Sequence, residues 1–209
     1  MAYNFQLNGS NIKELIFLIA SSKTYQMPSV GFKNSGEIVA QEYTFKGMLR
    51  KRMSAEQFAD AAATVFEPIF PDSIMMYKPQ FSPGFDTSLH FFARASLVAN
   101  NSFLTALGRP NRETVATSRE SQANLLQAME LTNGERFNSM IKRGAIKWKR
   151  EFKQSDAIIK EAYSRALGRA PSAGEFTVAK KLLGNNPSLE SIEDFFWSMM
   201  LLPEFQIIY

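Results

Sequence analysis

The amino-acid sequence predicts an all-α fold, a helical bundle of about six to eight helices with a long irregular insertion rich in proline and aromatic residues. Helix-capping residues recur before segments whose apolar residues have helical spacing, and most of these segments end at glycine or proline. The chain has 209 residues, of which 45% are hydrophobic, enough for one sizeable core. We expect a single domain over residues 1–209, in which a helical and irregular half, residues 1–117, packs against a helical half, residues 118–209.

The first helix is expected after Ser10 or Asn11, either of which can cap it. Its apolar residues recur at helical spacing until it ends near Ser22. Residues 25–47 contain one proline and three glycines and are expected to be mostly loop, with a short strand pairing around residues 38–45.

A second helix is predicted to begin at Ala55, because Ser54 and Gln57 form a capping-box pair and Met53 can pack onto Phe58. Four prolines and a glycine then interrupt residues 67–86, so this segment is expected to be irregular but packed through its aromatic residues.

The next helix is predicted over residues 91–107, ending where Gly108 can adopt a left-handed conformation. Thr117 and Glu120 form a second capping-box pair, which predicts a helix with Leu125, Leu126 and Met129 facing inward. Asn133 is expected to cap the following helix, which carries Phe137, Met140 and Ile141.

Three helices are predicted in the last 55 residues, with Ser155, Ser172 and Ser188 as their capping residues. Glu175 completes a capping box with Ser172, and Pro203 follows the last helix. The connections at residues 168–171 and 184–187 are short, which favours antiparallel neighbours.

Composition excludes several kinds of chemistry. The chain has no cysteine and one histidine, His90, so thiolate nucleophiles, zinc fingers and imidazole metal clusters are excluded. We expect neither a cofactor nor a metal. No apolar run approaches the roughly 20 residues that span a bilayer, and the first residues do not have the pattern of a secretory signal.

The strongest candidate for a binding site is the segment between residues 106 and 135, which contains three arginines, several amides and helix-start signals. Arginines offer forked donors and a helix start presents free N–H groups, a combination suited to an anionic or polar ligand. The alternative is that these arginines pair with nearby carboxylates and fix the loop to the bundle. The predicted site consists of Arg109, Arg112, Glu113, Arg119, Glu120, Gln122, Gln127 and Asn133.

Other candidates have an ordinary structural interpretation that we favour. His90 lies among apolar residues and is expected to be packed rather than a ligand. Glu56 and Asp60, four residues apart, are expected on a solvated face rather than at a cation site. The methionine pairs near residues 75 and 199 suggest core filling.

A basic cluster at residues 142–153 is interleaved with Trp148 and Phe152, as on surfaces that bind single-stranded nucleic acid. It is equally typical of an exposed connection between helices. Nucleic acid is therefore not favoured as a partner.

Several strings along the chain, taken in order, resemble the domain of unknown function numbered fifteen-fifty-three. They are NIKELI (residues 11–16), SKTYQ (22–26), RMSAEQ (52–57), GRPNRE (108–113), LQAMELTNGE (126–135), RALGRAP (165–171), WS (197–198) and PEF (203–205). The resemblance implies the C-terminal module of a large exported bacterial protein of the planctomycete type, with other domains, often of cytochrome-c type, upstream. It implies an extracytoplasmic location. Members of the family often carry cysteines near residues 115–119, which are absent here.

Together, the residues and the resemblance favour a non-catalytic docking or ligand-recognition module. Its expected partners are other domains of the parent protein and an anionic or polysaccharide ligand at the arginine-rich segment. The alternative is a carboxylate-dependent hydrolase acting on polysaccharide, with Glu113, Glu120 and Glu135 as candidate carboxylates. An electron-transfer partnership with a cytochrome domain is implied by the resemblance alone.

Overall fold

The structure, a computed structural model, describes residues 2–7, 9–29, 47–48, 50–71, 94–110 and 124–208. It divides into two compact units, one formed by residues 1–51 with 207–209 and the other by residues 52–206. The all-α prediction is confirmed, because helices dominate the described residues in both units. The predicted boundary at residues 117 and 118 lies outside the described residues and stays a prediction.

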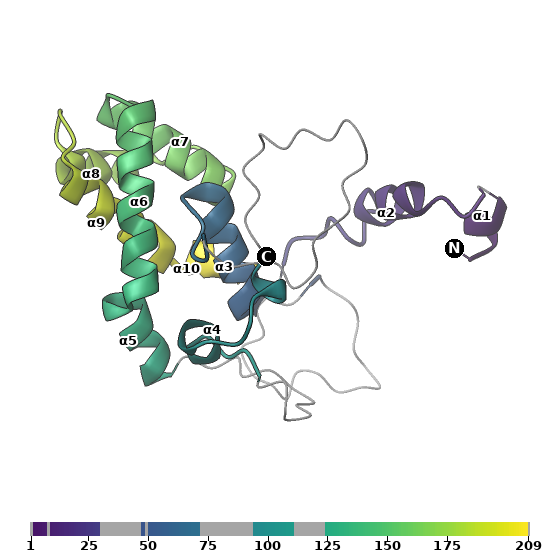
Figure 1. The fold of residues 1–209 in the computed structure, drawn as a ribbon. Coiled ribbons are helices and arrows are strands. Elements are labelled where there is room, and N and C mark those ends of the chain that lie inside the picture. The colour runs from purple at the N-terminus through teal and green to yellow at the C-terminus, as the bar shows by residue number, and fades with distance from the viewer. Residues whose placement is uncertain are drawn as a thin grey trace, which may run out of the picture. The chain divides into compact units, whose positions relative to one another are not determined.

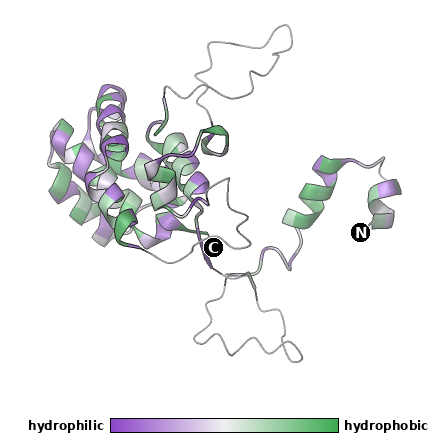
Figure 2. Ribbon diagram, turned by 60° about the horizontal axis from the view of Figure 1, so that its bottom comes forward, coloured by the Kyte–Doolittle hydropathy of each residue, from purple (hydrophilic) through white to green (hydrophobic). Residues whose placement is uncertain are grey.

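The first unit contains α1 (Ala2–Leu7) and α2 (Ile12–Ala20). Of the two predicted caps, Asn11 is the one used, since its side chain accepts hydrogen bonds from the backbone N–H groups of Lys13 and Glu14. The helix ends at Ser21, close to the predicted end. Although most of its residues are apolar, as the green ribbon of this helix in Figure 2 shows, α2 has no buried side chain.

One small sheet is described. Its strands, β1 (Lys51–Arg52) and β2 (Ile207–Ile208), are only two residues long and pair with each other. Next to them, the N–H of Met53 donates to the carbonyl oxygen of Gln206 at 2.8 Å. The strand pairing predicted around residues 38–45 lies outside the described residues.

The second unit begins with α3 (Ala55–Val65), whose capping box is confirmed. The N–H of Gln57 donates to the Ser54 hydroxyl, and the Gln57 side chain accepts from the N–H of Ser54. One face of α3 is buried, with Phe58 at its centre. Because both partners of a capping box lie within four residues, the start of α3 was predictable from the sequence.

The helix predicted over residues 91–107 is wrong in its described part. The chain forms a short 3-10 helix, η2 (Ala95–Leu97), and then a separate helix, α4 (Ser102–Ala106). Asn101 breaks the run, because its backbone is extended and its side chain accepts the N–H of Leu104 as the cap of α4.

The predicted end of this region is confirmed. Gly108 has φ +92°, and the N–H groups of Gly108 and Arg109 bond to the carbonyl oxygens of Thr105 and Leu104. Two such bonds around a residue in the left-handed conformation form a Schellman motif, and glycine adopts this conformation without strain.

Two further predictions fail at α5 (Leu125–Asn133) and α6 (Glu135–Glu151). Leu125, Leu126 and Met129 are exposed, whereas Gln127 and Leu131 are buried, so the inward face of α5 is the opposite one. Asn133 ends α5 instead of capping α6, whose N-cap is Gly134.

Gly134 leaves no room for a side chain at this junction. A Cβ atom there would lie 2.3 Å from the carbonyl oxygen of Glu130, and the N–H of Gly134 closes the last turn of α5 on that same oxygen. The two helices therefore meet at residues 133 and 134, as predicted, but by close backbone approach rather than by an asparagine cap. The predicted burial of Phe137, Met140 and Ile141 in α6 is confirmed.

The predicted C-terminal helices are α7 (Ser155–Leu167), α8 (Ala173–Leu183) and α9 (Leu189–Leu201), followed by α10 (Pro203–Gln206). The Ser172–Glu175 capping box and the Ser188 cap are confirmed. Ser155 is not the cap of α7 but its first residue, and its buried hydroxyl donates to the carbonyl oxygen of Gly184.

The core of the second unit is aromatic and is organised around α6. In Figure 1, α6 is the long green helix, and it packs most extensively against α9, while α7 packs against α8 and α8 against α9. Fully buried rings contact one another in two groups: Phe66 at the end of α3 with Trp148 and Phe196, and Phe103 on α4 with Phe137 on α6. The helices of this unit mix hydrophobic and hydrophilic residues along their length (Figure 2), as expected for helices with one buried face.

Arg169, which follows the left-handed Gly168 at the end of α7, joins two helices through carboxylates. Its guanidinium donates to both oxygens of Glu175 at 2.9 and 2.7 Å and to both oxygens of Glu204 at 2.8 and 2.7 Å. Hydrogen bonds from Arg169, and then from the N–H and hydroxyl of Ser172, lower the pKa of Glu175 to about 2. Arg169 also lowers the pKa of Glu204.

We therefore expect an acid-dependent loss of stability at this site. A carboxyl whose pKa is lowered in the folded state stabilises the fold fully above its ordinary pKa of 4.5, and this contribution is lost as the pH falls toward 2. Urea unfolding between pH 6 and about pH 2 should show a steeper fall in the free energy of unfolding for the wild type than for Arg169→Gln. Parallel curves for the two proteins would contradict the expectation.

Candidate functional site

Arg109, the first residue of the predicted site, is buried and makes only internal contacts among the described residues. Its guanidinium donates to the carbonyl oxygens of Ala95, Ser96 and Val98 at 3.3, 3.3 and 2.9 Å, and its Nε lies 3.4 Å from a carboxylate oxygen of Glu56. Its side chain is 8% exposed. These contacts match the alternative that the arginine fixes the loop to the bundle.

The other predicted residues are only partly described. Arg112, Glu113, Arg119, Glu120 and Gln122 lie outside the described residues. Gln127 is buried in α5, and Asn133 is exposed at the end of that helix, where it lines a shallow hollow between α4 and α5. A ligand-binding role for this set stays a prediction.

Glu56 and Asp60 do share one face of α3, but that face is not solvated. Asp60 accepts the N–H of Ala95 at 2.9 Å and lies 3.5 Å from Arg94, while Glu56 pairs with Arg109. Both carboxylates therefore bind the segment at residues 94–109 to α3. The expectation that they point into solvent is wrong, because a distant part of the chain covers them.

Only some of the remaining candidate residues lie in the described part of the chain. His90 and the methionines at 75 and 76 lie outside the described residues, whereas Met199 and Met200 are buried in the core as predicted. Glu135, the described carboxylate of the hydrolase alternative, is exposed in the first turn of α6.

The basic cluster at residues 142–153 is not a connection between helices, because nearly all of it belongs to α6. Trp148 is fully buried, and Phe152 packs against it at 5.2 Å between ring centroids. Of the two rings that suggested a nucleic-acid surface, Trp148 is therefore inside the protein and Phe152 is partly buried against it. The cationic side chains of α6 in this cluster are exposed except for Arg143, which is half-buried.

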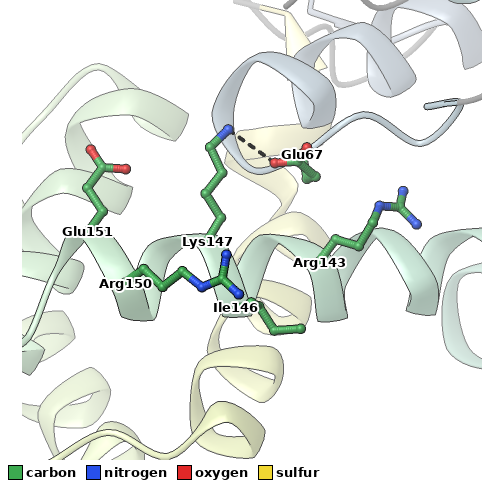
Figure 3. A pocket seen from close by; sticks show the side chains of 6 residues that line it. All are labelled: Glu67, Arg143, Ile146, Lys147, Arg150 and Glu151. Atoms are coloured by element: carbon green, nitrogen blue, oxygen red, sulfur yellow. Dashed lines mark hydrogen bonds and ion pairs between the residues drawn. The ribbon is translucent and has the colours of Figure 1, made fainter.

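One flank of α6 forms an open groove of about 500 Å³, here called the basic groove, shown in Figure 3. It lies between α6 and the turn that follows α3. Its lining residues are Glu67, Arg143, Ile146, Lys147, Arg150 and Glu151. Arg143, Lys147 and Arg150 recur at intervals of four and three residues, which places them on one side of a helix.

Both carboxylates of the basic groove form ion pairs with cations of the protein, but its arginines have hydrogen-bond donors without a partner among the described residues. Lys147 binds Glu67 at 3.1 Å, and Glu151 lies 3.5 Å from Arg165 on α7. Arg143 donates one Nη2 hydrogen to the carbonyl oxygen of Pro68 at 2.6 Å, while its buried Nε has no hydrogen-bond partner in the described part of the protein.

Arg150 lies at the other end of the groove. It is exposed and makes no hydrogen bond or ion pair with any residue that the structure describes. Among the described residues, the guanidinium donors of Arg150 are therefore unused and exposed, whereas the unpartnered Nε of Arg143 is buried. The spacing of the cations that line the basic groove was visible in the sequence, but the sequence could not show that Glu67 would lie opposite them.

The described residues contain no candidate metal centre, because none of their acidic side chains gather into a group of three or more that could hold a metal ion. None of the described helices combines the length and apolarity that a membrane-spanning helix needs.

These features define a helical domain with a cationic surface groove. The family model for "PSD1: Protein of unknown function (DUF1553)" matches residues 1–183, and the chain belongs to this family. The matched part contains the basic groove, whereas α9, which covers the inner side of α6, follows it in sequence. No curated protein and no solved structure matches the chain.

Proposed function

We propose that this chain is a non-catalytic docking or ligand-recognition module and that its ligand is an anionic group held in the basic groove. The observation that carries the proposal is the concentration of charge on α6. Residues 135–153 contain seven lysines or arginines and two glutamates, a surplus of five positive charges, whereas the whole chain has a surplus of four. The rest of the chain is therefore close to neutral, and the positive field is local.

The spacing of the two arginines suggests the form of the ligand. Arg143 and Arg150 are seven residues apart, which corresponds to about 10.5 Å along a helix axis. Guanidinium groups bind sulfate, phosphate and carboxylate through paired donors. A linear polyanion with charged groups about 10 Å apart fits this arrangement, and a sulfated or carboxylated polysaccharide has such a form.

The wider setting of the module is part of the same proposal. The resemblance of the motifs supports a C-terminal position in a large exported bacterial protein of the planctomycete type, with further domains, some of cytochrome-c type, as its neighbours in the chain. An extracytoplasmic module would meet polysaccharides directly.

Binding to heparin and to chemically desulfated heparin tests the proposal. We expect the wild-type chain to bind the sulfated polymer more tightly, and Arg150→Glu to weaken that binding by on the order of tenfold, because one donor becomes a repulsive charge. Isothermal titration calorimetry and the salt concentration that elutes the protein from immobilised heparin both measure this.

Lys181→Glu is the matched control. Like Arg150, Lys181 is exposed in the last turn of its helix, and its reversal changes the net charge equally. We expect this variant to bind heparin within about twofold of the wild type, since the contribution of distant charges is screened. Equal weakening by both substitutions, or equal wild-type binding to both polymers, would overturn the proposal.

A further inference from the structure

A second hollow lies on the opposite flank of α6 and shares no residue with the basic groove. It has a volume of about 440 Å³ and lies where the end of α5, the second and third turns of α6 and the middle of α9 meet. It is lined by Thr132, Asn138, Ile141, Lys142, Glu193, Asp194 and Trp197.

Trp197 gives this hollow a fixed aromatic surface. Its indole N–H donates to the carbonyl oxygen of Leu131 at 2.9 Å, which holds the ring to the end of α5. The residue is nevertheless 37% exposed, unlike Trp148, which is completely buried. A ring that is already immobilised and partly exposed loses little conformational entropy when a ligand stacks on it.

The polar side chains around Trp197 are not used internally. The side chains of Asn138, Lys142, Glu193 and Asp194 make no hydrogen bond or ion pair with one another or with any other described residue. Lys142 and the two carboxylates carry opposite charges and line the same hollow without forming a pair. Donors and acceptors are therefore both available to a guest.

A partly exposed aromatic ring among unpaired polar side chains indicates the chemical class of the ligand. A flat aromatic surface stacks on an apolar ring face, while carboxylate and amide groups bind neighbouring hydroxyl groups that both donate and accept. A pyranose ring has both features, because its C–H groups form an apolar face and its hydroxyl groups project from the rim. Two carboxylates and one ammonium give the lining a net negative charge, which disfavours a sulfated or carboxylated sugar.

We infer that the hollow around Trp197 binds an uncharged pyranose unit of a glycan. This inference does not depend on the basic groove, since the two sites share no residue and prefer ligands of different charge. The hollow falls in the range of about 300–1,000 Å³ that is typical of small-molecule sites, large enough for part of an oligosaccharide.

The full-length chain with Trp148→Phe gives a direct readout, because the chain has two tryptophans and this variant leaves Trp197 as the sole one. It is titrated with neutral oligosaccharides of glucose, mannose, xylose and N-acetylglucosamine, with calorimetry on the wild type in parallel. We expect a saturable change in tryptophan fluorescence with at least one of them. No saturable response to any of the four would overturn the inference.

Variants of the lining separate a binding role from a structural one. We expect Trp197→Ala and Glu193→Gln each to weaken binding by about tenfold or more, and Trp197→Phe to retain part of it because a ring remains. Glu190→Gln is the matched control, since Glu190 is exposed one turn earlier on α9 and does not line the hollow.

Thermal unfolding monitored by circular dichroism confirms that each variant is folded at the titration temperature. If Trp197→Ala does not fold, Glu193→Gln and Trp197→Phe decide the outcome. Unchanged affinity in both, or binding seen only with sulfated oligosaccharides, would contradict a site for an uncharged sugar.

Discussion

Replacing Arg109 by alanine is expected to lower the free energy of unfolding by about 3–5 kcal/mol. The substitution removes the donors of three backbone carbonyl oxygens and the guanidinium 3.4 Å from Glu56, all in a setting where Arg109 is 8% and Glu56 12% exposed. Buried acceptors that lose their donors are not compensated by water. The segment from η2 to α4 would lose one of its attachments to α3, and the contacts with Asp60 would remain.

Urea unfolding followed by circular dichroism measures this loss, with Arg94→Ala as the control. Arg94 also pairs with a carboxylate on α3, but its side chain is 64% exposed. An exposed ion pair contributes at most about 1 kcal/mol, so the control should be nearly as stable as the wild type. If Arg109→Ala were as stable as Arg94→Ala, the anchoring role of Arg109 would be contradicted. The Arg109 guanidinium would then be available to a ligand, and the arginine-rich segment would again be the favoured binding site.

Replacing Trp148 by alanine is expected to cost about 3–5 kcal/mol, as for other large aromatic residues in a core. Trp148 is completely buried and contacts side chains from three other parts of the second unit, two of them aromatic rings. Its ring centroid lies 5.0 Å from that of Phe196 and 6.2 Å from that of Phe66, and the Arg165 guanidinium lies 5.2 Å above it. The cavity left by the indole would separate α6 from α9 and α3.

Trp197→Ala is the comparison for Trp148→Ala, because the two residues are of the same type and lie on helices that pack together. Trp197 is partly exposed and makes one hydrogen bond to Leu131, so its removal should cost no more than about 2 kcal/mol. The midpoint of unfolding in urea is measured for both variants. Equal losses would show that the core is not centred on Trp148.

Several helix ends were predictable because the signal and its partner are close in sequence. Ser54 with Gln57 and Ser172 with Glu175 form their capping boxes, and Gly108 has the left-handed conformation predicted for it. At the junction of α5 and α6, two local signals competed. Asn133 directly precedes Gly134, and because Gly134 lies close to Glu130, Gly134 rather than Asn133 is the N-cap of α6.

The inward face of α5 shows a different kind of error. In a helix of nine residues, the apolar side chains of Leu125, Leu126 and Met129 indicate one face and Leu131 another, so periodicity alone does not decide between them. The tertiary structure decided it: α5 packs against α4 and α6, and in this arrangement Leu131 and Gln127 are buried while Leu125, Leu126 and Met129 are exposed.

The sequence by itself determined where most helices begin and end, because a cap or a left-handed glycine is satisfied by groups three to five residues away. Only the tertiary structure decided which polar groups are used and which remain available. Arg143 meets Pro68 across 75 positions of sequence and Lys147 meets Glu67 across 80, and no local pattern encodes either contact. The roles of Arg109 as an internal anchor and of Arg150 as an open donor follow from packing of this kind, since a charged side chain becomes a binding group only where the fold gives it no partner.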